Sequence, residues 1–197
     1  MLYNFLVMHK YFKIYKPYGY LSQFVNNQNK RRNKKLLSDL YNLPKEIMAI
    51  GRLDEKSEGL LLLTTNGKFS EHIRSSKIEK EYHVMVAGVI SKNDIEKLKN
   101  GIEISVNGKP YITKPCKAVI LNNTNHIEER FVRDKRHGET SWLSITITEG
   151  KYRQVRKMTS SVGFPTLRLV RVRIANYKLN ELKSGEIKTI NFPHFSQ

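Results

Sequence analysis

The sequence has little of several features that would point to particular classes of protein. A single cysteine, Cys116, stands among 197 residues, so neither a disulfide framework nor a cysteine-based metal cluster is expected. No apolar run approaches the roughly 18–20 residues that span a bilayer. The apolar start, MLYNFLVM, has neither the basic region nor the small-residue cleavage site of a signal peptide. We therefore expect a cytoplasmic protein with no membrane partner.

Motifs for cofactors and metals are also missing. The six histidines are scattered, without an HxH or HExxH pattern, and there is no phosphate-binding loop or dinucleotide-binding glycine pattern. We therefore expect no metal and no organic cofactor. No repeat and no low-complexity linker divides the chain. One domain over residues 1–197 is expected, with room for two lobes that share a core.

Acidic residues are scarce compared with basic ones. Thirty-five Lys and Arg against eighteen Asp and Glu leave a net charge of +17. Such a field attracts polyanions, and nucleic acid binds basic proteins through counterion release from its phosphates. An anionic membrane would be attracted too, but the sequence has no lipid anchor and no long basic amphipathic helix. The charge therefore predicts a nucleic-acid partner without indicating any chemistry.

Hydrophobic periodicity predicts many strands and a few short helices. Strands are expected within residues 11–24, 46–54, 59–65, 79–90, 115–121, 141–150 and 166–174, with a hairpin around Asn107-Gly108. Helices are expected at 68–76, at 91–101 with Ser91 as N-cap, and at 151–163, with a short helix or turn at 36–44. Within 151–163, Val155, Met158 and Val162 form the expected buried stripe. This order predicts an α+β fold on a mixed, mainly antiparallel sheet.

The stretch GRLDEKSEGLLLLTTNG places Asp54 between two glycines, Gly51 and Gly59. Glycines let a loop turn sharply and approach a ligand closely, and a carboxylate on such a loop can act as a nucleophile or base. Asp54 could instead cap the turn around Ser57 or pair with Arg52. The pattern by itself leaves these interpretations open.

The stretch EGKYRQVRKM brings four basic residues onto or beside one short helix: Lys151, Arg153, Arg156 and Lys157. Arg156 could pair with a catalytic carboxylate while the others hold phosphate, or the four could form a solvated basic face. Tyr152 and Arg156, at i and i+4, are expected to share an edge of the buried stripe.

The stretch KEYHV places Lys80 and Tyr82 on one side of a strand and His83 on the other. A tyrosine beside a lysine suits stacking on a base next to a phosphate. Ordinary strand packing would explain Tyr82 as well. His83 is interpreted as structural.

Together with KPYG (residues 16–19) and LRLVRVRI (167–174), these stretches occur in the order and rough spacing of the RsuA-type pseudouridine synthase family. The sequence resembles that family from about residue 11 to 190. The stretch GRLD…SEGLLLLT is the family's signature. Many relatives carry an additional RNA-binding domain of the S4 type, which is not found here. The sequence is therefore similar to the branch that acts on the large ribosomal subunit.

The resemblance implies isomerisation of a uridine in 23S ribosomal RNA to pseudouridine, with a central catalytic cleft and no metal or cofactor. By position in the motifs, Asp54 corresponds to the catalytic aspartate, which acts as nucleophile at C1′ or base at C2′. Arg156 corresponds to its basic partner. Arg52 corresponds to the residue that fills the gap left by the flipped-out uridine, and Tyr82 to the ring that stacks on the flipped uracil.

Further basic residues are expected to contact the RNA: Lys16, Lys80, Lys151, Arg153, Lys157 and Arg171, with Arg31 and Arg32 of the loop at 26–35. The segments 26–35 and 122–140 are expected to influence the choice of target. A non-enzymatic RNA-binding protein on the same fold, a ribosome assembly factor, and a synthase for small-subunit or transfer RNA remain alternatives. A monomer is expected, because no long apolar edge or heptad is present.

Overall fold

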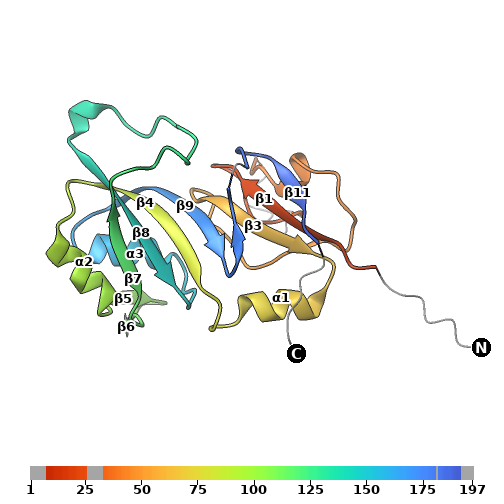
Figure 1. Cartoon of the computed structure of the whole chain (residues 1–197), viewed down its shortest axis with the longest axis horizontal. Helices are drawn as coiled ribbons and strands as arrows, with labels where there is room; N and C mark the ends of the chain where they lie inside the picture. Colours follow the sequence, from red (N-terminus) through yellow and green to blue (C-terminus); the bar gives the residue numbers. More distant parts are fainter. Residues whose placement is uncertain (1–7, 26–32, 181, 192–197) are drawn as a thin grey trace, which may run out of the picture.

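The computed structural model describes residues 8–25, 33–180 and 182–191. Within these residues the chain builds a nine-stranded sheet, whose main path runs β11-β1-β3-β9-β4-β8-β7, with β2 beside β3 and β10 beside β9 (Figure 1). The strands are β1 (Tyr11–Lys16), β2 (Met48–Ala49), β3 (Glu58–Thr64), β4 (Lys80–Ala87), β7 (Lys117–Leu121), β8 (Thr140–Ile147), β9 (Thr166–Ile174), β10 (Tyr177–Lys178) and β11 (Ile187–Thr189).

The β3–β9 pair is parallel, and the other pairs of the sheet are antiparallel. This parallel pair joins two groups of strands. One group consists of β11, β1, β2 and β3, and the other of β9, β10, β4, β8 and β7. A separate hairpin consists of β5 (Glu103–Val106) and β6 (Lys109–Ile112). The prediction of an α+β fold with a mixed, mainly antiparallel sheet is confirmed.

β3 is buried along its whole length. Its side chains alternate between two hydrophobic clusters, with Leu60 and Leu62 in one and Leu61 and Leu63 in the other. A strand covered on both faces reads as a continuous apolar run, which explains the four successive leucines. The strand is therefore a rigid support for the loop that precedes it.

Short helices cover the two groups of strands (Figure 1). They are α1 (Gly67–Arg74), α2 (Lys92–Lys99) and α3 (Gln154–Ser161). Ser91 caps α2 by accepting a hydrogen bond from the Asp94 backbone, as predicted. None of the helices in the described part of the chain has the length and apolar character that crossing a membrane requires.

α3 begins at Gln154 rather than at residue 151. The backbone of Arg153 is left-handed, with φ 53° and ψ 34°, and this breaks the helical path. Val155 and Met158 are buried as predicted. Tyr152, however, lies outside the helix and is 71% exposed, so the expectation that it shares an edge with Arg156 is wrong.

The segment at 122–139 leaves the end of β7, returns at β8 and contacts the other group of strands. Ile127 packs in the hydrophobic cluster that contains Leu60. The Arg168 guanidinium of β9 donates to the Glu128 carbonyl at 2.8 Å, and the Ser184 backbone N–H donates to the Glu128 carboxylate at 2.9 Å. This segment therefore ties the two groups of strands together.

Candidate active site

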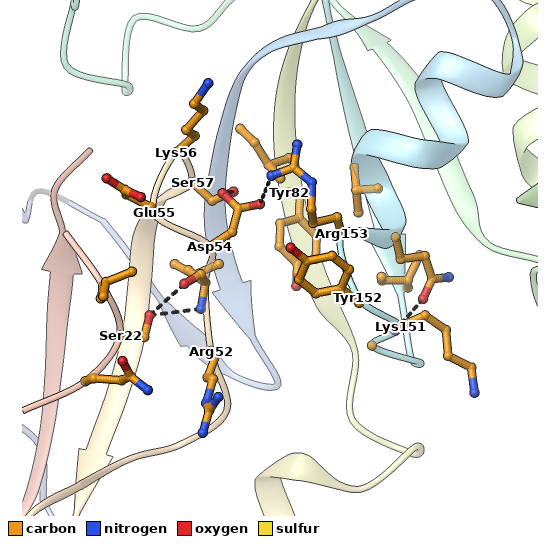
Figure 2. Close-up of a pocket in the computed structure, with 18 residues that line it drawn as sticks. Ser22, Arg52, Asp54, Glu55, Lys56, Ser57, Tyr82, Lys151, Tyr152 and Arg153 are labelled. Atoms are coloured by element: carbon orange, nitrogen blue, oxygen red, sulfur yellow. Dashed lines mark hydrogen bonds and ion pairs between the residues drawn. The ribbon is translucent and has the colours of Figure 1, made fainter. Parts of the chain in front are cut away.

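A cleft of about 680 Å³ lies between the loop at 52–57 and the segment at 150–155. Tyr82, Ile147 and Leu169 of the central strands also line it, and residues 21–23 complete one edge. Figure 2 shows the two segments facing each other across this space, with Asp54 on one side and Arg153 on the other. The cleft is therefore formed by parts of the chain that are about one hundred residues apart.

The loop at 52–57 is held in place at both ends. Gly51 and Gly59 have φ values of 68° and 100°, and residues other than glycine rarely adopt such values. Ser22 fixes the middle: its hydroxyl donates to the Leu53 carbonyl at 2.9 Å and accepts from the Leu53 N–H at 3.0 Å. Ser22 is buried, and no local motif in the sequence indicates its role, because its partner is thirty-one residues away.

In the described part of the chain, the Asp54 carboxylate accepts hydrogen bonds from three side chains. Ser57 Oγ donates to Oδ1 at 2.9 Å. Arg153 Nη1 and Arg156 Nε both lie 3.2 Å from Oδ2. The interaction with Ser57 agrees with the turn-capping interpretation, and the pairing with Arg156 agrees with the resemblance. The carboxylate therefore makes both contacts at once, and its catalytic role stays a prediction.

Arg156 is the buried partner of Asp54. Its side chain is 9% exposed, and its Nη2 donates to the Lys56 carbonyl at 2.8 Å and to Ser57 Oγ at 3.2 Å. Burial lowers the pKa of the Arg156 guanidinium, and the Asp54 carboxylate opposes that shift. These contacts fix both the charge and the orientation of Arg156 on the loop that carries Asp54.

Tyr82 and Arg52 both line the cleft but differ in exposure. Tyr82 is 8% exposed and packs in the core beside Val84 and Leu143, so it is both a core residue and a wall of the cleft. Arg52 is exposed, and Figure 2 shows its side chain directed away from Asp54. The alternative in which Arg52 pairs with Asp54 is not what the structure shows.

Lys151 and Arg153 also line the cleft, as their predicted role requires. The segment that carries them is anchored by buried Glu149, which accepts from Tyr111 Oη at 2.6 Å and from Gln154 Nε2 at 2.6 Å. Burial raises the pKa of Glu149, but these hydrogen bonds outweigh it and hold the pKa below its ordinary value. The Glu149 carboxylate thus joins the β5–β6 hairpin to the start of α3.

Two residues predicted to bind RNA are interior. Lys16 is fully buried, and its Nζ donates to the Pro17 carbonyl at 2.8 Å and to the Tyr20 carbonyl at 2.7 Å. Arg171 is 4% exposed, and its Nε donates to the Leu60 carbonyl at 2.8 Å. The prediction that these residues contact RNA is wrong, because neither presents its charge at the surface. Lys16 instead holds the turn that leads to the edge of the cleft.

The other predicted contacts lie outside the cleft lining. Lys80 is partly buried, and its Nζ donates to the Ile78 and Thr148 carbonyls. Lys157 donates to the Ser105 carbonyl at 2.5 Å and so joins α3 to β5. Their contact with RNA stays a prediction. Arg31 and Arg32 lie outside the described residues.

A buried ion pair next to the cleft was also missed. Glu58 follows Ser57 directly, is 2% exposed, and is bonded through both carboxylate oxygens to Arg168, which is 4% exposed. A charged residue that is buried at the start of a continuous apolar run must find a partner. That signal was present in the sequence, but the identity of the partner on β9 was not.

Comparison with known proteins gives a consistent result. Residues 10–161 match the family described as RNA pseudouridylate synthase. A protein of Vibrio parahaemolyticus named ribosomal large subunit pseudouridine synthase E is 40% identical over 178 residues, which cover 89% of this chain and 71% of that protein. A Xanthomonas axonopodis protein of the same name is 39% identical, covering 85% of this chain and 86% of its own.

Solved structures agree with these sequence matches. A crystal structure of a pseudouridylate synthase superposes with a TM-score of 0.75 at 27% identity and covers 95% of this chain and 72% of its own. A Cbf5-Nop10-Gar1 complex shares the fold, with a TM-score of 0.58 at 16% identity, covering 89% of this chain and 52% of its own.

Proposed function

Because the chain belongs to the RNA pseudouridylate synthase family and is thus an isomerase, we propose that it modifies one uridine of 23S ribosomal RNA, with Asp54 acting at the ribose. The names of its relatives support the large ribosomal subunit as the source of the substrate. A net charge of +17 favours encounter with any RNA. The charge thus supports the substrate class, and the relatives support the particular RNA.

The observation that carries the proposal is the environment of Asp54. Its carboxylate is 19% exposed, lines the cleft, and pairs with the guanidinium of Arg156, whose side chain is only 9% exposed. The ion pair holds the carboxylate at the wall of the cleft, where a nucleophile at C1′ or a base at C2′ would have to lie.

The proposed reaction is an isomerisation whose atoms balance within the substrate. The C1′–N1 bond of the uridine breaks, the uracil turns while held in the cleft, and a C1′–C5 bond forms. C5 loses a proton and N1 carries one in the product. Asp54 assists either by bonding to C1′ and leaving again, or by taking a proton from C2′ and returning it.

Base flipping is part of the proposal. A stacked nucleotide does not expose C1′, so the uridine must leave the helix at a cost of roughly a few kcal/mol. A cleft of about 680 Å³ is in the range of sites that enclose a nucleotide-sized ligand. In this proposal the ring of Tyr82 stacks on the uracil, and the exposed side chain of Arg52 enters the vacated position in the RNA.

The test compares cells that lack the protein with the same cells restored by wild type, Asp54→Asn or a control, Asp94→Asn. Asp94 lies on α2, away from the cleft lining. Pseudouridines in ribosomal RNA are mapped by carbodiimide-dependent stops of reverse transcription. We expect one stop in large-subunit RNA that wild type and Asp94→Asn restore and Asp54→Asn does not.

RNA affinity is measured on the same purified proteins. Asp54→Asn should bind RNA within a few-fold of wild type, because the substitution leaves the basic residues in place. If Asp54→Asn restores the stop, Asp54 is not the reacting group. If no stop depends on the protein at all, it is better described as an RNA-binding protein on this fold.

A further inference from the structure

Arg153 and Arg156 donate to the same oxygen of Asp54 but are held very differently. Both nitrogens lie 3.2 Å from Oδ2. Arg156 is 9% exposed and is bonded as well to the loop at Lys56 and Ser57. Arg153 is 36% exposed and reaches Asp54 through a single N–H. Exposed ion pairs are weakly held, so the contact from Arg153 is much the easier to break.

The Arg153 contact crosses the cleft. Asp54 belongs to the loop before β3 and Arg153 to the segment before α3, and Figure 2 shows the guanidinium extending from one wall to the carboxylate on the other. Anything that enters the cleft beside Asp54 meets this bridge. A nucleotide that brings its ribose to Asp54 must therefore displace the Arg153 side chain.

The contact also occupies Oδ2 of the Asp54 carboxylate. Each carboxylate oxygen accepts about two hydrogen bonds, and Arg153 and Arg156 together fill both positions on Oδ2. Ser57 takes one position on Oδ1. An oxygen with both lone pairs engaged is a poor nucleophile and a poor base, because a lone pair must be free for either step.

We infer that Arg153 is a substrate-displaced latch: it bridges the cleft to Asp54 in the free protein and transfers to a phosphate of the bound RNA. Transfer frees one position on Oδ2 for the ribose and leaves Arg156 as the fixed counter-ion. This inference rests on the proposed action of Asp54 on RNA. It makes Arg153 a positioning residue that acts through Asp54.

The backbone and surroundings of Arg153 fit this role. A left-handed conformation is uncommon for a residue other than glycine or asparagine, and such conformations are enriched at functional sites. A phosphate is a good alternative partner, since a guanidinium can bond to two of its oxygens. Exposed Lys151 at the same lip adds attraction for the RNA backbone.

The test removes the side chain without straining the backbone. Arg153→Gly suits the positive φ, and Arg153→Asn is a second variant that tolerates the same conformation. Single-turnover rate constants are measured at saturating RNA, with a fragment that carries the mapped uridine. A second fragment has one phosphate beside that uridine replaced by an uncharged methylphosphonate, first on the 5′ side and then on the 3′ side.

For wild type we expect one of the two replacements to lower the rate constant about ten-fold or more. The Arg153 guanidinium then has no charged phosphate to which it can transfer when it leaves Asp54. In both variants the ratio between native and uncharged RNA should fall to about one, since there is no latch to open. Equal ratios in wild type and variants would overturn the inference. The variants would then have lost the same factor of rate on both RNAs, which would identify Arg153 as a permanent counter-ion of Asp54.

Failure of the proposed function is distinguishable from failure of the latch. If Asp54 is not the reacting group, Asp54→Asn retains its rate constant on the native fragment. If Asp54 reacts but no latch exists, Asp54→Asn is inactive while the ratio between the two RNAs is the same with and without the Arg153 side chain. The Lys92→Ala variant is the control, because it removes an exposed cation of α2 that does not line the cleft. Its ratio should stay that of wild type.

Discussion

Replacing Glu58 by glutamine tests how the two groups of strands are joined. Glu58 lies at the start of β3 and Arg168 on β9, at the central parallel pair of the sheet. Their hydrogen bonds are 3.1 Å (Nε to Oε1) and 3.0 Å (Nη2 to Oε2), and both side chains are almost fully buried. Arg130 adds a third contact, from Nε to Oε1 at 3.0 Å. Glu58→Gln would leave the Arg168 charge buried without its carboxylate.

The expected loss follows from that burial. Removing one partner of a buried pair costs about 3–5 kcal/mol, and glutamine retains one acceptor oxygen, so we expect a value near the lower end. With a urea m-value of about 2 kcal/mol/M, a loss of about 3 kcal/mol lowers the unfolding midpoint by about 1.5 M. Urea unfolding followed by circular dichroism measures this shift directly.

A double-mutant cycle separates the pair from its surroundings. Arg168→Gln leaves Glu58 with Arg130, and the double variant removes both buried charges, so its loss should be smaller than the sum of the single losses by about 2 kcal/mol. Glu96→Gln, in an exposed pair with Lys99, is the control and should shift stability by less than about 1 kcal/mol. Strictly additive losses, or a Glu58→Gln variant as stable as Glu96→Gln, would refute the reasoning.

Two other predictions concern the turns that frame the cleft. Burial lowers the pKa of Lys16 to about 8, below its unfolded value of about 10.4. Between these two pH values the unfolded chain binds one more proton than the folded chain. The free energy of unfolding of the wild type should therefore rise with pH across that window. Lys16→Met should lack this rise in urea midpoints measured from pH 7 to 10; identical pH profiles would contradict it. Gly59→Ala should cost at least about 3 kcal/mol, because φ is 100° and the new methyl would meet the β9 backbone. Gly67→Ala, with open space at the first turn of α1, is the thermal-unfolding control, and equal melting temperatures would contradict the prediction.

Local patterns predicted most of the elements, because local rules govern them. The leucine run indicated a strand, and in the structure Leu60 to Leu63 alternate between two clusters. Ser91 and Asp94 form the cap that begins α2. The start of α3 could not be placed, since the left-handed turn at Arg153 has no sequence signature comparable to a glycine. An arginine at that position reads as an ordinary helical residue.

The candidate site was predicted in part, and its errors have one cause. Asp54 and Arg156 were paired through the motifs, and the structure brings them to 3.2 Å. Lys16 and Arg171 were expected to contact RNA, as exposed basic residues do. Both are buried and bonded to backbone carbonyls. Whether a cation is exposed depends on which strands surround it, and composition carries no information about that.

The sequence by itself determined the mixed sheet, the charge that favours RNA, and the glycine-flanked loop that presents Asp54, because these depend on residue type and on spacing along the chain. Only the tertiary structure decided which residues meet Asp54 and which cations remain inside. Arg156 is 102 positions from Asp54 in the chain, and Arg168 is 110 from Glu58. Such contacts depend on strand order and register, and these arise from the packing of the whole sheet.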